Sequence, residues 1–263
     1  IYLAPTKALA ADQLARIDAL AVPGVRAATY DGDTPPDERR WIRDHANLVL
    51  TNPDLLHHSL LPGHERWARF LRSLRYVVVD ECHVYRGVFG SHVASVIRRL
   101  RRVAARYGSF PTFVLASATV SDPATHAARL IGMPVTAVTL DGSPRGALTF
   151  ALWEPATEDG HRRSATTEAA QIMAELVLRG VQVVAFARSR AGAESLASSA
   201  RRRIEHDDPV SAAGVSAYRG GYLPVERRQI ERALRDGSVR GLAATNALEL
   251  GIDISGLDAV LIA

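Results

Sequence analysis

Two adjacent carboxylates follow an apolar run in the first third of the chain. Residues 76–79 read Tyr-Val-Val-Val, Asp80 and Glu81 come directly after them, and His83 lies two positions further on. An apolar run without a polar break predicts a fully buried central strand. Ligands of open parallel sheets bind outside the carboxyl ends of the strands, so one carboxylate could hold a hydrated Mg²⁺ and the next could activate an attacking water. The spacing alone leaves two interpretations open: phosphate chemistry, or a charged loop that caps a buried strand.

Residues that could take part in binding phosphate also follow other apolar runs. They are Pro5, Thr6 and Lys7; Thr51 and Asn52; Ser117 and Thr119; Arg188; and Thr245 and Asn246. Backbone amides and hydroxyls at helix N-termini are suited to binding phosphate. The alternative for Thr6 and Thr51 is ordinary helix capping, and Arg188 is equally well explained as a solvated loop residue.

The elements that must position these groups alternate between strands and helices. Apolar patterning predicts strands at 1–4, 25–30, 48–51, 76–79, 112–116, 134–140, 147–153, 182–187, 215–218, 240–244 and 258–262. It predicts helices at 8–20, 35–44, 91–105, 122–131, 167–178, 191–203 and 224–235. Alternation of this kind implies parallel crossovers and doubly wound sheets. A turn cluster at 141–144 predicts a boundary between two α/β domains, 1–144 and 145–263.

Composition narrows the class of protein. The chain has 263 residues, of which 47% are hydrophobic and 23% charged, so two globular domains can each bury a core. No apolar run approaches the roughly 20 residues of a membrane span, and the start lacks a signal-peptide pattern, so we expect a cytoplasmic protein with no membrane partner. The single cysteine, Cys82, excludes internal disulfides and is better explained as a small spacer than as a reactive thiol.

The basic residues limit which phosphate-binding motifs the chain can contain. Net charge is +4, and the 32 basic residues include one lysine, Lys7. This mild positive balance is compatible with a nucleic-acid partner. A phosphate-binding P-loop needs a lysine directly after a glycine, whereas Lys7 follows Thr6 in a segment without glycine. The 263 residues therefore contain no P-loop.

The order of these motifs resembles the superfamily two DExH-box helicases. Residues 4–9, 51–54, 80–83, 117–119 and 245–253 resemble helicase motifs Ia, Ib, II, III and V, and the strand at 183–187 stands for motif IV. More narrowly, residues 83–92 and 141–146 resemble the DNA-repair branch related to mitomycin repair factor A. By this resemblance the chain is a fragment from motif Ia to motif V, and the P-loop and the final arginine-finger motif lie outside it.

The resemblance implies a fold and a set of roles. The fold is two tandem RecA-like domains with parallel sheets, their first and last parts truncated: an ATPase domain at 1–144 and a helicase C-terminal domain at 145–263. Asp80 would hold Mg²⁺ through water, Glu81 would activate the water that attacks ATP, and His83 would link this site to Ser117 and Thr119 for coupling. Gly251 and Asp253 would touch the nucleotide. The nucleic-acid strand would be gripped by Pro5, Thr6, Lys7, Thr51, Asn52, Arg188, Thr245 and Asn246.

The expected function is that of an ATP-dependent DNA helicase or translocase in DNA repair, which uses ATP and Mg²⁺ and moves along single-stranded or partly duplex DNA. The full-length parent would be the active enzyme, and this fragment alone is expected to be inactive. Two alternatives remain open: an RNA helicase, and a non-catalytic nucleic-acid-binding module.

Three other features can each be interpreted as structural or as functional. The arginines of the helix at 91–105 indicate either a nucleic-acid surface or the solvated side of an amphipathic helix, and the second is favoured. The aromatic and basic turn at 218–222 could stack on a base or be a plain loop. A surface loop explains His57, His58 and His64 better than a metal site does.

Overall fold

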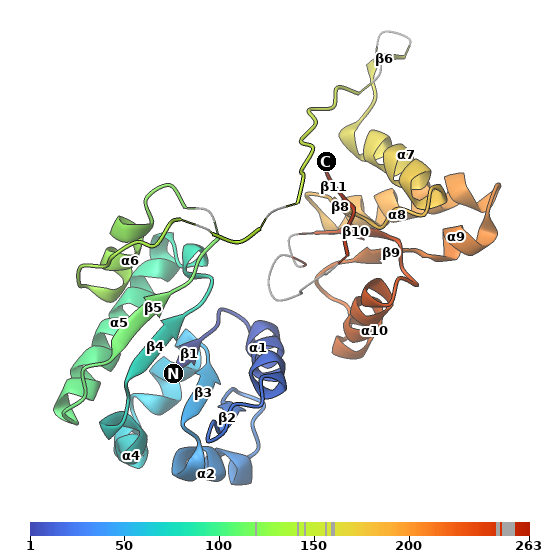
Figure 1. Ribbon diagram of the computed structural model, residues 1–263. Helices are drawn as coiled ribbons and strands as arrows, with labels where there is room; N and C mark the ends of the chain where they lie inside the picture. The colour runs from blue at the N-terminus through green and yellow to red at the C-terminus, as the bar shows by residue number, and fades with distance from the viewer. Residues whose placement is uncertain are drawn as a thin grey trace. The chain divides into compact units, whose positions relative to one another are not determined.

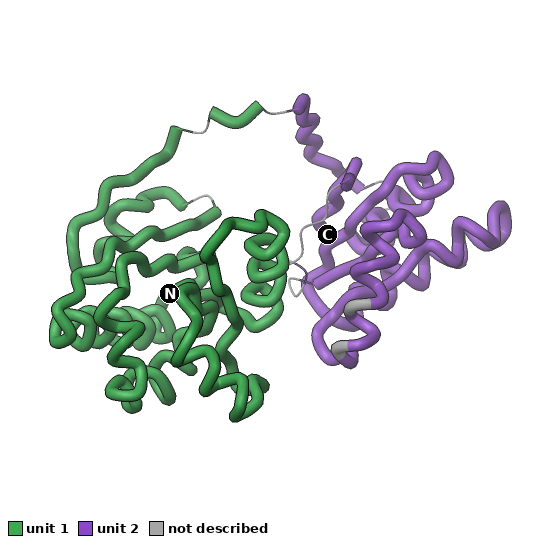
Figure 2. Tube along the Cα trace, turned by 60° about the horizontal axis from the view of Figure 1, so that its bottom comes forward, with its two compact units in different colours: residues 1–144 green, residues 145–263 purple. Residues whose placement is uncertain are grey.

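The computed structural model describes residues 1–118, 120–140, 142–144, 146–155, 157–158, 161–245, 248 and 256–263. The chain divides into two compact units, Ile1–Pro144 and Arg145–Ala263 (Figure 2). Each unit has its own parallel sheet and its own buried core. None of the described helices combines the length and the apolar composition that crossing a bilayer requires.

The sheet of the first unit has five parallel strands in the order β2-β3-β1-β4-β5 (Figure 1). The strands are β1 (Tyr2–Leu3), β2 (Ala27–Thr29), β3 (Leu48–Thr51), β4 (Tyr76–Val79) and β5 (Thr112–Leu115). Leu3 lies opposite both Thr51 and Val79, and Val79 lies opposite Leu115. Four strands therefore end in line, and the residues that follow them emerge at one edge of the sheet.

Helices cover both faces of this sheet. On one face, Leu9 and Ala10 of α1 (Lys7–Ala19) cluster with Leu50. The larger core on the other face includes Val93, Ile97 and Leu100 of α5. The remaining elements of the unit are α2 (Pro36–His45), α3 (Pro53–Leu55), η1 (Leu56–Leu60), η2 (His64–Trp67), α4 (Ala68–Arg72), η3 (Cys82–Val84), α5 (Gly87–Arg106) and α6 (Pro123–Ile131).

The second unit repeats this plan with four parallel strands in the order β11-β8-β10-β9. They are β8 (Val183–Phe186), β9 (Val215–Tyr218), β10 (Gly241–Ala244) and β11 (Ala259–Ile262). Apolar side chains alternate between the faces: Val183 and Ala185 join one core cluster, and Val184 joins the other. The first cluster includes residues of α7 (Ala165–Leu178), α8 (Arg190–Glu205) and α9 (Pro209–Ala213), and the second includes residues of α10 (Pro224–Arg235).

The predicted fold class, two α/β units with parallel sheets, is confirmed. Two predicted strands, 134–140 and 147–153, are wrong. These segments are extended but have no sheet partner among the described residues, and Leu140 and Leu148 are 95% and 90% exposed. Alternating apolar residues establish the period of a strand but not the presence of a neighbour to pair with.

Two predicted boundaries also differ from the structure. Between the predicted strand at 147–153 and the predicted helix at 167–178, where no element was expected, lies a short antiparallel pair, β6 (Thr157–Glu158) and β7 (His161–Arg162). Helix α5 begins at Gly87, four residues before the predicted start at 91. Gly90 lies within α5 and allows close packing, because a Cβ there would lie 2.4 Å from the carbonyl oxygen of Tyr85.

Candidate functional site

Asp80 is held from two sides at the end of β4. Its backbone N–H donates to the carbonyl of Leu3 at 2.9 Å, which continues the pairing with β1. Its Oδ1 accepts the backbone N–H of Glu81 at 2.9 Å, and its Oδ2 accepts the hydroxyl of Tyr2 at 2.5 Å. Because a carboxylate has about four acceptor positions, both oxygens can still accept from water.

Glu81 adopts a left-handed backbone conformation, with φ 46° and ψ 42°. This conformation is uncommon for residues other than glycine and costs on the order of 1 kcal/mol or more. It turns the chain sharply from β4 into η3. The Oε2 of Glu81 lies 3.1 Å from Nδ1 of His83, although the angle is not that of a hydrogen bond. The two candidate side chains Glu81 and His83 are thus brought together.

The turn after Glu81 is tied to the segment that follows β5. The backbone N–H of Cys82 donates to Ala116 at 2.9 Å, and the carbonyl of Cys82 lies 2.8 Å from Nε2 of His126, on α6. Burial raises the pKa of the Cys82 thiol, and a hydrogen bond with the Ser117 side chain opposes part of that rise. A raised thiol pKa and burial both agree with Cys82 as a spacer.

The predicted coupling residues are only partly described. Ser117 contacts Cys82, and no hydrogen bond joins Ser117 to His83 in the described part of the chain. Thr119 lies outside the described residues. The link from His83 to Ser117 and Thr119 therefore stays a prediction.

Three side chains near the carboxylates were not identified from the sequence. Tyr2 belongs to β1, Tyr85 follows η3, and His126 belongs to α6. Burial, followed by the hydrogen bond to Asp80, raises the pKa of the Tyr2 hydroxyl, so it remains a donor. Tyr85 is 2% exposed, and burial raises its pKa as well. The sequence carries no signal for the role of Tyr2, because its contact with Asp80 depends on the register of β1 against β4.

The candidate strand-gripping residues after β1 and β3 have local structural roles. The Oγ1 of Thr6 accepts from Leu9 at 3.2 Å and caps α1, and the Oδ1 of Asn52 accepts from Leu55 at 2.8 Å and caps α3. Capping uses acceptors only, so the Thr6 hydroxyl proton and the Asn52 amide can still donate to phosphate.

Thr51 and Lys7 differ in how well they can reach a ligand. The Thr51 side chain is buried, and its hydroxyl donates to the carbonyl of Tyr30 at 2.7 Å. A buried hydroxyl is poorly placed for contact with a polynucleotide, so Thr51 instead fixes the position of Asn52. Lys7 is exposed and pairs with Asp33 at 2.7 Å, a hydrogen bond that raises its pKa. An exposed pair of this kind is weak and can exchange for a phosphate.

In the second unit, Arg188 and Thr245 follow β8 and β10 at the same edge of the sheet. Arg188 is exposed, and Ser189 next to it caps α8 by accepting from Gly192 at 2.9 Å. Thr245 is 7% exposed, and its backbone N–H donates to Tyr218 at 3.1 Å. Asn246, Gly251 and Asp253 lie outside the described residues.

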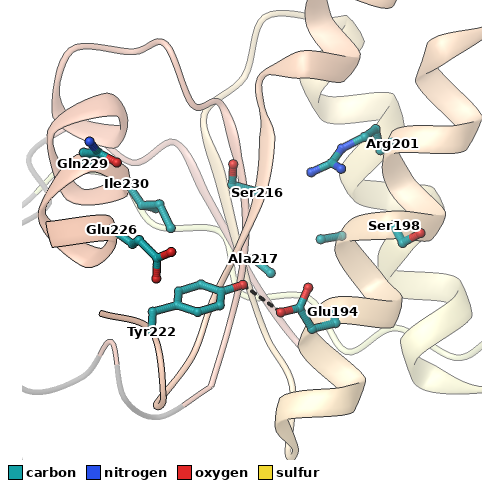
Figure 3. A pocket seen from close by; sticks show the side chains of 10 residues that line it. Glu194, Ser198, Arg201, Ser216, Ala217, Tyr222, Glu226, Gln229 and Ile230 are labelled. Carbon is teal, nitrogen blue, oxygen red and sulfur yellow. Dashed lines mark hydrogen bonds between the residues drawn. The ribbon is translucent and has the colours of Figure 1, made fainter. Parts of the chain in front are cut away.

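A cavity of about 370 Å³ lies within the second unit and is lined by residues of α8, β9, α10 and the turn before α10 (Figure 3).

The turn at 218–222 is held by a glutamate of α8. The hydroxyl of Tyr222 and the Nε of Arg219 each donate to Glu194 at 2.7 Å. The Arg219 guanidinium also lies 4.6 Å from the centre of the Tyr222 ring. The turn at 218–222 is thus anchored to α8, and one face of its tyrosine is covered, which favours the plain-loop interpretation over base stacking.

The arginines of α5 have a structural role that the sequence did not predict. Arg98 donates to the carbonyl of Arg129 at 2.7 Å, and Arg101 donates to the carbonyls of Ile131 and Gly132 at 2.9 and 3.0 Å. These carbonyls end α6 and lack partners within that helix. The two arginines therefore cap α6.

We expect Arg101→Ala to lower the free energy of unfolding by about 1 kcal/mol, because it removes charged donors from helix-terminal carbonyls. Urea unfolding would measure this loss. Arg102→Ala is the matched control, since Arg102 is the next residue of α5 and is exposed. Nucleic-acid affinity should be the same for both variants, and a selective loss of affinity in Arg101→Ala would contradict the capping role.

Comparison with known proteins assigns the class. The model of the DEAD/DEAH box helicase family matches residues 1–127, and that of the helicase conserved C-terminal domain matches residues 168–263. The chain belongs to the DEAD/DEAH box helicases of superfamily two.

Individual relatives place the similarity more narrowly. The chain is 44% identical to the uncharacterized ATP-dependent helicase YprA of Bacillus subtilis, over 98% of this chain and 35% of the relative. It is 43% identical to the ATP-dependent helicase HRQ1 of Saccharomyces cerevisiae, over 99% of this chain and 25% of the relative. The crystal structure of the DUF1998 helicase MrfA bound to DNA and AMPPNP is 43% identical, with a TM-score of 0.92, over 99% of this chain and 37% of that chain. The branch predicted from residues 83–92 and 141–146 is therefore confirmed, and the chain spans about a third or less of these relatives.

Proposed function

We propose that the chain is the motor part of an ATP-dependent DNA helicase or translocase that acts in the cytoplasm on DNA under repair. In this proposal, residues 1–144 form the ATPase domain and residues 145–263 the helicase C-terminal domain. The observation that carries the proposal is the pair Asp80 and Glu81, one held by two donors and the other turned by a left-handed backbone at the end of a central strand. Relatives named as ATP-dependent helicases, and one solved with DNA and AMPPNP, support the same conclusion.

The donor set around Asp80 fits Mg²⁺ bound together with a nucleotide. Magnesium at phosphate sites is usually held by one or two carboxylates, substrate phosphates and water, not by a cage of protein ligands. Asp80 supplies carboxylate oxygens with spare acceptor positions for a metal-bound water, and the described residues contain no group of three or more acidic, histidine or cysteine side chains that could hold an ion. When bound, Mg²⁺ would neutralise charge on the transferred phosphoryl group. The phosphate-cradling P-loop would come from outside these 263 residues.

Glu81 would orient and deprotonate the water that attacks the γ-phosphate of ATP. Its carboxylate lies beside His83, which would help to hold it in place. His83, Ser117 and Thr119 would then couple this site to movement. Gly251 and Asp253 would complete the nucleotide contacts, as the family resemblance implies.

On each unit, the nucleic-acid strand would lie at the sheet edge where the strands end. Pro5, Thr6, Lys7 and Asn52 from the first unit, and Arg188 and Asn246 from the second, would contact its backbone, whereas the buried Thr51 and Thr245 would support the residues next to them. Phosphate contacts carry no information about base identity, so binding should show little sequence preference and strong salt dependence.

Unwinding by the full-length protein tests the proposed substrate. A tailed DNA duplex and a tailed RNA duplex of the same sequence would be compared in the presence of ATP and Mg²⁺, with EDTA as the control. We expect ATP-dependent unwinding of the DNA duplex that EDTA abolishes. Faster unwinding of the RNA duplex than of the DNA duplex would show that RNA is the substrate. Binding of both duplexes without ATP turnover would indicate the non-catalytic nucleic-acid-binding module.

We expect Lys7→Ala to weaken binding of single-stranded DNA equally for all sequences, because Lys7 would contact a phosphate. The slope of log affinity against log salt should fall in magnitude by about 0.7, the value for one phosphate contact on a single strand. Salt titrations of DNA binding would measure the slope. An unchanged slope would show that Lys7 does not contact the DNA.

A further inference from the structure

Tyr2 is locked in place next to the carboxylate that the proposed function assigns to Mg²⁺. In the β1–β4 pair, Tyr2 lies opposite Val78, two residues before Asp80. Tyr2 packs against the apolar cluster that Leu9 and Ala10 of α1 form with Ala4 and Leu50. A tyrosine fixed by a sheet on one side and a helix on the other has little freedom to move its hydroxyl.

Each oxygen of the Asp80 carboxylate accepts one hydrogen bond from the protein. One donor is the backbone N–H of Glu81, which any residue at position 81 other than proline would supply. The other is the Tyr2 hydroxyl, the side-chain donor that reaches Asp80 within the described part of the chain. Without it, one carboxylate oxygen loses its protein partner and the side chain can rotate. The orientation of Asp80 therefore depends on Tyr2.

We propose that Tyr2 is a positioning residue that sets the affinity of the motor site for Mg²⁺ by holding Asp80 in one orientation. The inference rests on the proposed function, since it assumes that Asp80 faces a nucleotide-bound metal. Groups that hydrogen-bond to metal-facing carboxylates typically change metal affinity by about 10–100-fold. Tyr2 itself would touch neither metal nor nucleotide.

Tyr2→Phe in the full-length protein tests this role, because it keeps the ring and removes the hydroxyl alone. We expect the Mg²⁺ concentration for half-maximal ATP hydrolysis to rise about tenfold, while the turnover at saturating Mg²⁺ changes little. Binding of AMPPNP, measured by calorimetry over a series of Mg²⁺ concentrations, should show the same rise without any turnover.

Two controls separate positioning from general structure. Tyr107→Phe removes a tyrosine hydroxyl that lies 2.7 Å from His64 in the same unit, and it should leave the Mg²⁺ dependence unchanged. In an Asp80→Ala background, Tyr2→Phe should have no further effect on the Mg²⁺ dependence of AMPPNP binding, because the acceptor of the Tyr2 hydroxyl is gone.

Folded Tyr2→Phe protein with the wild-type Mg²⁺ dependence would overturn the inference and leave the proposed function intact. The same holds if Tyr2→Phe raises the Mg²⁺ requirement equally in the Asp80→Ala background. Wild-type protein that neither binds nor hydrolyses ATP would overturn the proposed function, and this inference with it.

Discussion

Replacing Glu81 with glutamine in the full-length protein should lower DNA-stimulated ATP hydrolysis by about 100-fold or more, the usual contribution of a general base. Glutamine keeps the size and the hydrogen-bonding reach of glutamate but cannot take a proton from water. Steady-state turnover with saturating single-stranded DNA would measure the loss. AMPPNP binding should be retained, because Glu81 acts on the water rather than on the nucleotide.

Glu38→Gln is the matched control for this substitution, since Glu38 is an exposed carboxylate on α2 in the same unit. Its turnover should equal that of the wild type. Turnover in Glu81→Gln within a few-fold of the wild type would contradict the assignment of Glu81 as the base.

Gly90→Ala should be the most destabilising single-methyl change in the first unit. The new Cβ would lie 2.4 Å from the carbonyl oxygen of Tyr85, and these are backbone atoms that cannot rotate away. Overpacking of this kind costs about 1–3 kcal/mol, occasionally more. Since Tyr85 and Glu81 lie at the two ends of η3, the shift should also disturb Glu81. Thermal or urea unfolding would measure the loss, together with ATP turnover.

Ser91→Ala provides the comparison at the next position of α5, where the side chain is exposed and its hydroxyl donates to the carbonyl of Gly87. It should cost much less than Gly90→Ala. Equal stability of the two variants would show that α5 can move away from Tyr85.

The sequence predicted the parts of the fold that depend on local periodicity. Helix α10 and the strands β3, β4 and β9 begin and end where their patterns predict, because each packs against elements within this chain. The extended segments at 134–140 and 147–153 failed because strand formation needs a neighbour, and none is present among the described residues. A pattern in one segment cannot report whether its partner exists.

The sequence predicted which carboxylates form the candidate site, but it predicted few of the contacts that those side chains make. Motif order identified Asp80 and Glu81, but Tyr2 was missed because its role arises only from the register of β1 against β4. His126 was missed for the same reason, since 44 residues separate it from Cys82. Thr51 is buried because it lies opposite Leu3 in the sheet and its hydroxyl donates to the carbonyl of Tyr30. Such contacts depend on tertiary packing, which spacing along the chain does not encode.

The rate of ATP hydrolysis by the full-length wild-type protein, with and without single-stranded DNA in the presence of Mg²⁺, tests the central claim most directly. A site built from Asp80 and Glu81 at a sheet edge that also grips a strand predicts ATP turnover that DNA increases. Properly folded protein that binds DNA but has no ATP turnover under either condition would contradict a motor function for this chain.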